Sequence, residues 1–510
     1  MKLLRRLAKR FGYVPATRAY NLGAVNRLTG DWIFNQNDAN REIRQDLKVM
    51  RERARDLERN NDYVRRYFKL LENNVLGAGG IGLQMKIREM IRVKNTWQER
   101  YDKRANDLLE LAWRKWGKRA NCTVGQTLTW RDLQGMVLRS VARDGAVIIR
   151  KHSTGPFGLQ LELIEIDQLE TDRSEMLAPN EIKLGVEYNP SGQVVAYHML
   201  TRHPGSSYSD VSVGRRMRVP AQDIIHVYDP ARIGQATGVP WIHSAGFNLK
   251  QLGAFMEAEV IASRAAACKG GWLSREGSEG YVGPADAAGN KTMEMSPGVW
   301  EELPVGLKPI PFDPTHPNTA FGDFVKSSLR AIAAGLGVSY VSLANDLEGV
   351  NYSSIRAGLL DEREEWKKLQ GWFIDWFIQP VFDEWLARAL SMGAVADNGQ
   401  ILPAGKFEKF NQPEWKPRRW AWVDPLKDLQ ASVLAVEKGF TSRRAIIGEN
   451  GGDIEDTFQD IAADEALEET YGLDFASAPG GQEANEQPET PDDPDDPKPK
   501  GVDKEDNVDE

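Results

Sequence analysis

The sequence predicts an α+β protein that is mainly helical. Apolar residues recur at helical spacing in several stretches, most clearly over 40–74 and 356–390. A block of short strand-like segments occupies 146–200, and two proline-free helical segments, 246–268 and 320–336, flank a stretch rich in glycine and proline. A chain of 510 residues is also long enough for several modules.

Composition excludes three broad classes of protein. Hydrophobic residues make up 41 % of the chain and charged residues 27 %, which is typical of a protein that buries a sizeable core. No apolar run reaches the roughly 18 residues that a membrane span needs. Two cysteines, Cys122 and Cys268, are too few for a disulfide framework. An integral membrane protein, a secreted disulfide scaffold and a zinc finger are therefore not expected.

The charge is distributed unevenly between the ends and the body. The net charge is −9, but residues 479–510 alone hold 12 acidic residues and 3 lysines, which leaves 62 acidic and 62 basic residues for 1–478. We expect this acidic tail, taken as 476–510, to be disordered because it has little apolar surface to bury. Residues 1–30 hold seven basic residues and no acid, which indicates a basic arm or a simple solvated terminus.

The first quarter of the chain is predicted to be mostly helical. Residues 40–74 form two helices, separated at 60–62 by side chains that can cap the second one. Residues 77–82 match the letters G-x-G-x-x-G, but a helix precedes them and the strand-like 83–87 follows. Because a dinucleotide site needs the order strand, loop, helix, a glycine-rich helix end is the better interpretation. A further helix is expected over 96–119.

The middle of the chain combines a helix with strands. A helix is expected over 129–143, and Asn189–Gly192 is a good hairpin turn. Four strands are expected over 146–151, 159–166, 182–188 and 194–200.

Five acidic residues in this region raise the question of a metal site. Alternation along a strand would place most of them on a solvated face, and no histidine lies at ligand spacing nearby. No metal site is therefore predicted among these residues, which are Glu162, Glu165, Asp167, Glu170 and Asp172.

The second half is predicted to contain a stalk and more helices. Helices over 246–268 and 320–336 would leave and rejoin the body, with the Gly/Pro-rich 274–318 between them. A polar stretch follows, and then a long aromatic-rich helix over 356–390 that is expected to kink near Pro380 and to pack in the core or against another subunit. Further helices are expected over 424–467, broken near 448–452.

Motifs of common catalytic sites are absent from the sequence. There is no G-x-x-x-x-G-K-[ST], so the chain carries no P-loop and is not itself an ATP motor. Neither G-x-S-x-G nor H-E-x-x-H occurs, and the six histidines are dispersed. A nuclease built on scattered carboxylates stays open as an alternative, because such sites leave little trace in a sequence.

Four segments together resemble one family. They are Arg53–Gln84, Val219–Trp241 with its Arg-x-Gly-Gln…Gly-Val-Pro core, Asn351–Leu360, and Trp420–Asp464. Their sequences and order are similar to those of the lambda-type (lambda family) portal proteins of tailed bacteriophages. The basic arm, the Gly/Pro-rich insertion and the acidic tail lie outside the resemblance.

The resemblance implies a structural function. A portal is a ring, usually a dodecamer, at one capsid vertex, through which double-stranded DNA is packaged and ejected and to which the tail is joined. The implied partners are other copies of the chain, DNA, the terminase large subunit, a head–tail adaptor, and the major capsid and scaffold proteins. No enzyme activity, cofactor, metal or small-molecule substrate is implied. The expected location is the virion, after assembly in the host bacterial cytoplasm.

The resemblance also implies a division of the chain into a wing, a stem, a clip and a crown. The implied segments are a basic arm (1–30), α/β wing (31–241), first stem helix (242–272), clip (273–318), second stem helix (319–337), tunnel-loop region (338–355), long wing helix and return to the wing (356–425), crown helices (426–475) and acidic tail (476–510).

The expected DNA-facing surface follows from spacing and composition. Lys326 and Arg330 are four residues apart and share one face of the second stem helix, so we expect this face to line the channel; an ordinary solvated face is the alternative. The tunnel loop offers polar and acidic side chains without Lys or Arg. Its residues are Asn345, Asp346, Glu348, Asn351 and Tyr352.

Two other functions remain as alternatives. One is a metal-dependent DNA-processing enzyme of a phage, which a magnesium-dependent cleavage assay would detect. The other is a scaffold- or membrane-binding adaptor that works through the basic arm, which co-sedimentation with liposomes would detect.

Overall fold

The computed structural model describes most of the chain between residues 36 and 473. The described ranges are 36–93, 96–206, 216–267, 271–275, 307–311, 321–348, 352–397, 400–420, 425–449 and 454–473. The predicted basic arm and acidic tail lie outside them, as does most of the predicted clip. The chain divides into two units, Met1–Arg419 and Trp420–Glu510.

The first two helices form as the sequence predicts. Helix α2 (Ala39–Asn60) ends where Asn61 accepts hydrogen bonds from the first backbone N–H groups of α3 (Asp62–Val75). Glycines with positive φ follow, and the chain enters strand β1 (Gly82–Met85), which pairs with β16 (Pro413–Lys416). The order is helix, glycines, strand, so the G-x-G-x-x-G letters mark a helix end, as predicted.

The helix predicted over 96–119 is wrong in its first turn and a half. Residues Thr96–Tyr101 form strand β3, which pairs in an antiparallel hairpin with β2 (Arg88–Val93). The helix α4 (Lys103–Trp116) begins only after Asp102, whose side chain accepts a hydrogen bond from the N–H of Ala105. Thr96, Trp97 and Tyr101 favour strands, and cross-strand pairing decided their conformation.

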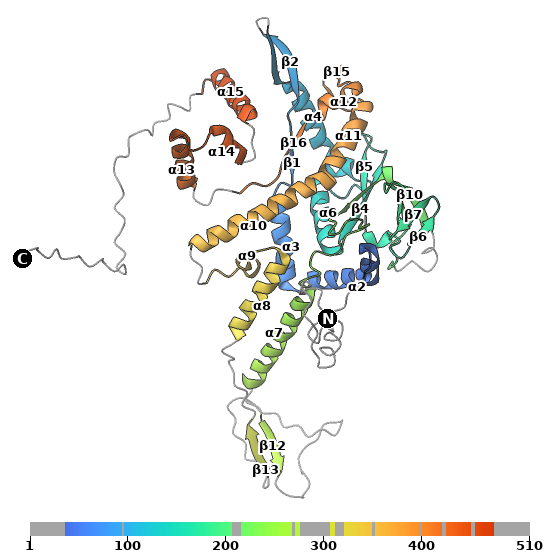
Figure 1. Cartoon of the computed structure of the whole chain (residues 1–510), viewed down its shortest axis with the longest axis vertical. Helices are drawn as coiled ribbons and strands as arrows, with labels where there is room; N and C mark the ends of the chain where they lie inside the picture. The colour runs from blue at the N-terminus through green and yellow to red at the C-terminus, as the bar shows by residue number, and fades with distance from the viewer. Residues whose placement is uncertain are drawn as a thin grey trace, which may run out of the picture. The chain divides into compact units, whose positions relative to one another are not determined.

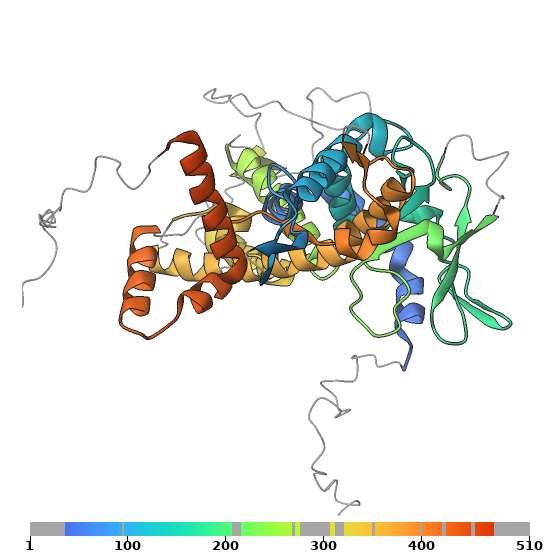
Figure 2. The same ribbon diagram turned by 90° about the horizontal axis from the view of Figure 1, so that it is seen from above.

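Two antiparallel sheets enclose one apolar core (Figures 1 and 2). The first has the order β11-β4-β5 and the second the order β10-β9-β8-β7-β6. Side chains of both sheets, such as Ile148 of β4 and Met199 of β9, are buried together between them. The strands are β4 (Ala146–His152), β5 (Gln160–Ile164), β6 (Glu175–Leu177), β7 (Asn180–Lys183), β8 (Val186–Tyr188), β9 (Val194–Leu200), β10 (Arg216–Pro220) and β11 (Ile224–Tyr228).

The single strand predicted over 182–188 is two strands. Lys183 of β7 pairs with Val186 of β8, so Leu184 and Gly185 form a two-residue hairpin turn with φ of 50° and 81°. Leucine disfavours a positive φ, but here its side chain is fully buried in the core between the sheets. Burial of the side chain therefore offsets the free-energy cost of the positive φ at Leu184. A turn was not predicted here because hairpin turns usually have glycine, asparagine or aspartate at such positions.

The aromatic-rich helix packs in the core, as predicted, but its course differs. It consists of α10 (Tyr352–Phe373), a π-helical turn (Ile374–Ile378) and α11 (Gln379–Ser391), so it begins four residues before the predicted 356. The π-helical turn ends two residues before Pro380. Proline has no N–H to donate and its ring crowds the preceding turn of a regular helix, so the wider π-helical turn accommodates it.

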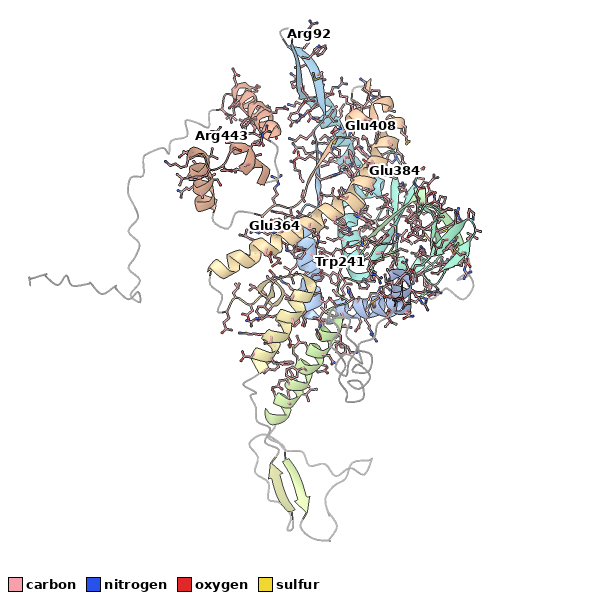
Figure 3. All side chains as sticks on the ribbon, in the orientation of Figure 1. Arg92, Trp241, Glu364, Glu384, Glu408 and Arg443 are labelled. Atoms are coloured by element: carbon pink, nitrogen blue, oxygen red, sulfur yellow. The ribbon has the colours of Figure 1, made fainter. Side chains whose placement is uncertain are left out.

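A cluster of aromatic rings holds this helix against the rest of the first unit. Trp113 of α4 contacts Trp116 of the same helix, Trp130 of α6 (Trp130–Asp144) and Phe382 and Trp385 of α11, with ring centroids 4.6–5.4 Å apart. On its other side α11 is tied to the sheet by an ion pair. Glu384 (labelled in Figure 3) lies 2.6 Å from Nζ of Lys151 on β4.

Two helices correspond to the predicted stalk. Helix α7 (Gly246–Ala267) lies beside α8 (Phe321–Leu336) (Figure 1). The ring of Phe255 on α7 contacts the rings of Phe321 and Phe324 on α8. The first helix ends at Ala267 rather than at the predicted 272. Gly271–Arg275 is strand β12, paired with β13 (Leu307–Pro311), so the described part of the Gly/Pro-rich stretch contains short strands.

The second unit contains the helices predicted over 424–467. They are α13 (Pro425–Glu437), α14 (Arg443–Glu449) and α15 (Ile454–Tyr471). The remaining short elements of the first unit are α5 (Arg119–Cys122), α9 (Tyr340–Ala344), α12 (Phe407–Phe410), β14 (Ala396–Asp397) and β15 (Gln400–Ile401).

We expect Gly145→Ala to destabilise the first unit. Gly145 ends α6 with φ of 88°, and a Cβ there would lie 2.6 Å from the carbonyl oxygen of Gly238. Both the backbone conformation and the clash oppose alanine, so the free energy of unfolding should fall by more than about 1 kcal/mol. Thermal unfolding followed by fluorescence measures this change.

Gly135→Ala is the matched control. Gly135 is in the same helix, and a Cβ there meets no atom within 4 Å. Because alanine favours a helix, this variant should be as stable as the parent protein or up to about 1 kcal/mol more stable. Equal melting temperatures for the two variants would contradict the role assigned to Gly145.

Candidate nucleic-acid interface

The surface predicted to face DNA is built around the turn between α8 and α9. Gly337, with φ of 68°, ends α8, and Ser339 caps α9 by accepting a hydrogen bond from the N–H of Ser342 at 3.1 Å. Asn345 ends α9 with φ of 55°, the left-handed conformation that asparagine tolerates. Three residues suited to helix ends therefore fold 345–348 back toward α8.

The predicted stem cation Lys326 meets the predicted tunnel loop. Its Nζ lies 3.2 Å from a carboxylate oxygen of Glu348. The side chain of Lys326 is 39 % exposed and that of Glu348 is 81 % exposed, so water reaches the pair. An ion pair this exposed contributes about 0.2–1 kcal/mol.

The second stem cation, Arg330, meets the same loop through Tyr340. Its guanidinium lies 5.4 Å from the centroid of the Tyr340 ring, a cation–π contact. The Tyr340 hydroxyl donates a hydrogen bond of 2.7 Å to Asp346, whose other carboxylate oxygen accepts one from the N–H of Glu348 at 3.0 Å. Tyr340 thus connects a cation on α8 to a carboxylate in the loop.

The pKa values of Tyr340 and Asp346 reflect this arrangement. Desolvation, followed by the hydrogen bond to the Asp346 carboxylate, raises the pKa of Tyr340 to about 12. The hydrogen bond from Tyr340, followed by the bond from the backbone and by the charges of Lys326 and Arg330, lowers the pKa of Asp346. At neutral pH the loop therefore presents an ionised carboxylate and a neutral phenol.

A buried carboxylate holds α9 in place. Glu362 of α10 is 7 % exposed and accepts hydrogen bonds from the N–H of Ser339 (3.4 Å), the hydroxyl of Ser342 (2.8 Å) and the indole of Trp366 (3.2 Å). From the other side Arg66 of α3 donates to the carbonyl of Ser342 at 3.1 Å. Helices α3 and α10 thus fix the helix that carries Tyr340.

Most of the predicted site residues come together in the structure. Lys326, Arg330, Asn345, Asp346 and Glu348 all lie at this corner. The irregular segment is shorter than the predicted tunnel-loop region of 338–355, because Tyr340–Ala344 is the helix α9 and α10 already begins at Tyr352.

The last two residues predicted for the loop, Asn351 and Tyr352, are not among the residues described at this site. Asn351 lies outside the described residues, and Tyr352 is the first residue of α10 rather than part of a loop.

Sequence reasoning missed Tyr340 and Glu362. Tyr340 follows a helix end without any distinctive motif. Glu362 is one of several charged residues in the run Asp361–Glu365, and only the fold shows that it is the buried one.

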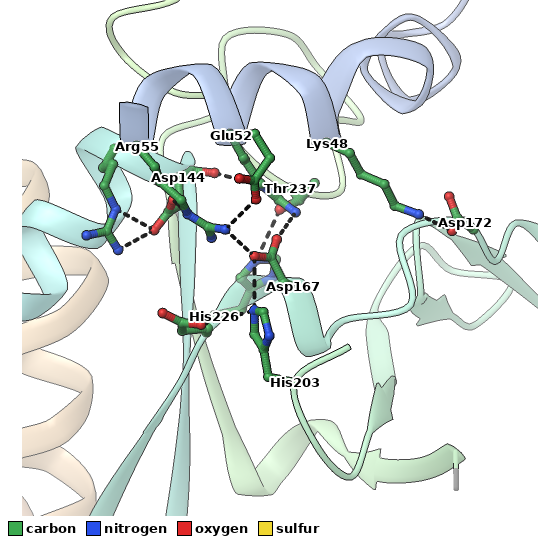
Figure 4. A network of polar contacts seen from close by, with 12 residues as sticks. Lys48, Glu52, Arg55, Asp144, Asp167, Asp172, His203, His226 and Thr237 are labelled. Carbon is green, nitrogen blue, oxygen red and sulfur yellow. Dashed lines mark hydrogen bonds and ion pairs between the residues drawn. The ribbon is translucent and has the colours of Figure 1, made fainter. Parts of the chain in front are cut away.

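A second polar cluster corrects the interpretation of the acidic residues near β5 (Figure 4). Asp167 is not on a solvated strand face. It lies in a short 3₁₀ turn and pairs with Arg55 of α2 at 2.6 Å and with the buried Arg51 at 3.6 Å. Burial would raise the pKa of Asp167, but the hydrogen bond and charge of Arg55 outweigh it and lower the pKa. Glu170 is also buried, and it pairs with Arg216 at 2.6 Å.

This cluster is a poor site for a cation. His203 lies 3.2 Å from Glu165 and 3.4 Å from Asp167, so three ligand types found around metals meet here, although the sequence predicted no histidine nearby. The two guanidiniums already neutralise Asp167 and would repel a metal ion. The cluster instead joins α2 to the sheets.

Comparison with known proteins establishes the family. The model for "Phage portal protein, lambda family" matches residues 25–370. The chain belongs to the lambda family of phage portal proteins. The resemblance in the sequence and the mainly helical α+β class are both confirmed, and the function is that of a portal at the capsid vertex, which makes the protein a component of the virion.

Sequence matches to individual relatives cover most of the chain. A probable portal protein of Halomonas phage phiHAP-1 is 30 % identical and the match covers 88 % of this chain and 86 % of the relative. Portal protein B of Escherichia phage lambda is 22 % identical, with 80 % and 81 % covered.

A solved structure is also similar. It is titled the neck of a native GTA particle, computed with C12 symmetry, and it covers 78 % of this chain and 93 % of its own at 14 % identity and a TM-score of 0.40. None of the helices described here is both long and apolar enough to span a bilayer.

We expect Glu362→Ala to loosen α9 and the loop that follows it. The substitution removes the acceptor for three hydrogen bonds, from Ser339, Ser342 and Trp366. The indole N–H of Trp366 is buried, and leaving it unsatisfied costs about 1–3 kcal/mol. Hydrogen exchange of the amides in 340–346 should become faster.

Glu362→Gln provides the control, because its single amide oxygen can still accept hydrogen bonds at one of the two positions that the carboxylate oxygens occupy, either from Ser339 and Ser342 or from Trp366. Its exchange rates should lie between those of the parent protein and those of the alanine variant. Unchanged exchange in 340–346 for the alanine variant would contradict the anchoring role of Glu362.

Proposed function

We propose that this portal protein assembles with identical copies into a ring, a dodecamer, whose axial channel conducts double-stranded DNA during packaging and ejection. Helices α7 and α8 are the stem, the segment with β12 and β13 is the clip between them, and the helices of the second unit are the crown. The face of α8 that carries Lys326 and Arg330 lines the channel.

One observation supports this assignment most strongly. Lys326 of α8 is in direct contact with Glu348 of the acidic loop 345–348, and Arg330, four residues further along α8, reaches Asp346 of the same loop through Tyr340. Each subunit therefore offers DNA a surface on which positive and negative groups are closely paired.

This pairing suits a conduit, in which DNA must move without being held. A protein that makes about 6–10 phosphate contacts loses about 10³–10⁵ in affinity between low and moderate salt, which shows how strongly such contacts retain DNA. In a ring of twelve copies, one unpaired lysine per subunit would already supply that number. Partial neutralisation by the loop keeps the total attraction small.

Apolar side chains on the stem helices provide surface for neighbouring copies. Phe247, Val260 and Ile261 of α7 and Phe324 of α8 are each more than half exposed in the single chain. A ring of identical subunits uses such surface in head-to-tail contacts that close on themselves.

The remaining parts of the proposal concern partners. We expect a terminase large subunit to supply ATP-driven motion, a head–tail adaptor to bind the clip, and the major capsid and scaffold proteins to surround the wing. The portal protein itself has no catalytic role in this scheme, and assembly takes place in the cytoplasm of the host bacterium.

The double substitution Lys326→Glu and Arg330→Glu tests the channel assignment. Two added carboxylates per subunit would repel phosphates along the whole channel, so DNase-protected DNA per particle should fall several-fold while negative-stain images still show rings.

Lys115→Glu with Arg119→Glu is the matched control. This pair also consists of one lysine and one arginine four residues apart, and both are exposed on the wing. It should package DNA like the parent protein. Normal packaging by the Lys326/Arg330 variant, or an equal loss in the control, would contradict the proposal.

A further inference from the structure

The two carboxylates of the loop are held very differently. Asp346 accepts two hydrogen bonds, from the Tyr340 hydroxyl and from the backbone of Glu348. The side chain of Glu348 is 81 % exposed, and it pairs with the ammonium of Lys326. Asp346 is therefore an anchor of the loop backbone, whereas the Glu348 side chain is free to leave by rotation alone.

We propose that Glu348 is a tethered substitute for a DNA phosphate, which occupies Lys326 when no duplex is next to it and is exchanged for a phosphate as DNA passes. This inference rests on the proposed channel role of α8, and it adds a regulatory role for one loop side chain at that site.

The exchange is energetically close to neutral. An exposed lysine–carboxylate pair changes an equilibrium constant by at most about fivefold, and a single exposed lysine–phosphate pair is of the same kind. Replacing one anion by the other at Lys326 therefore creates neither a deep minimum nor a high barrier. A duplex moving past successive subunits would meet a shallow electrostatic profile.

The contacts around Glu348 allow its side chain to leave Lys326 while the loop keeps its conformation. Asn345 is fixed in the left-handed conformation at the end of α9, and α9 is held by Glu362 and Arg66. Tyr340 keeps Asp346 next to Arg330. Because these contacts do not involve the Glu348 carboxylate, its departure leaves them intact.

The test uses assembled rings of the full chain and a fluorescent duplex. Binding is measured over a series of salt concentrations for the parent protein and for Glu348→Gln, Lys326→Gln and the double variant. Negative-stain images confirm that each forms rings. The slope of log K against log salt reports the number of phosphates contacted.

We expect Glu348→Gln to tighten DNA binding, by up to about fivefold for each lysine that meets a phosphate, and to steepen the salt dependence. Adding Lys326→Gln should abolish this gain, because the freed ammonium is its source. Non-additivity of the two substitutions measures the coupling.

Glu364→Gln is the control for a general change in charge. Glu364 pairs with Lys367 on α10 at 2.6 Å, and both side chains are more than half exposed. This variant should bind DNA like the parent protein. An equal gain in Glu364→Gln and Glu348→Gln would overturn the exchange proposal.

Two failures can be distinguished. If Glu348→Gln leaves binding unchanged but Lys326→Gln weakens it, the exchange is wrong and the channel role stands. If Lys326→Gln has no effect in either background, α8 does not face DNA, and the channel assignment fails together with the exchange.

Discussion

The candidate interface depends on the buried carboxylate of Glu362. It is one of the few acidic side chains that the first unit buries, and it joins α10 to the start of α9 through Ser339 and Ser342. Because α10 is itself held by the aromatic cluster around Trp113 through α11, the position of Tyr340 is set by the core of the first unit. Arg330 then lies over the Tyr340 ring, and Asp346 accepts a hydrogen bond from the Tyr340 hydroxyl. The exposed residues between α8 and α9 are thus held in place by contacts that extend into the core.

Under the proposed channel role, the same arrangement would allow a protein whose body is neutral to contact a polyanion. The body of the chain has equal numbers of acidic and basic residues, and the corner of α8 and α9 repeats that balance on a small scale. A nucleic-acid binding protein that must hold its target accumulates unpaired cations. A conduit has the opposite requirement, which is why paired charges at the α8 face fit a portal better than a positively charged patch would.

Periodicity and helix-end residues predicted much of the fold. The capping side chains at 60–62 and the apolar spacing over 356–390 indicated element boundaries correctly or within a few residues. The errors arose where tertiary contacts override local preference. Thr96–Tyr101 is a strand because β2 pairs with it, and Leu184 occupies a tight turn because the core buries its side chain. Helical spacing also placed Lys326 and Arg330 together, but the residues that organise them, Tyr340 and Glu362, carry no sequence signal of their own.

Photo-crosslinking from position 330 in particles that contain a packaged genome tests the central claim most directly. A photoreactive side chain placed there, in rings that still package DNA, should become covalently joined to DNA on irradiation, whereas the same group at position 115 on the wing should not. DNA attached at 115 as efficiently as at 330, or no DNA attached at 330, would show that α8 does not line the path of the genome.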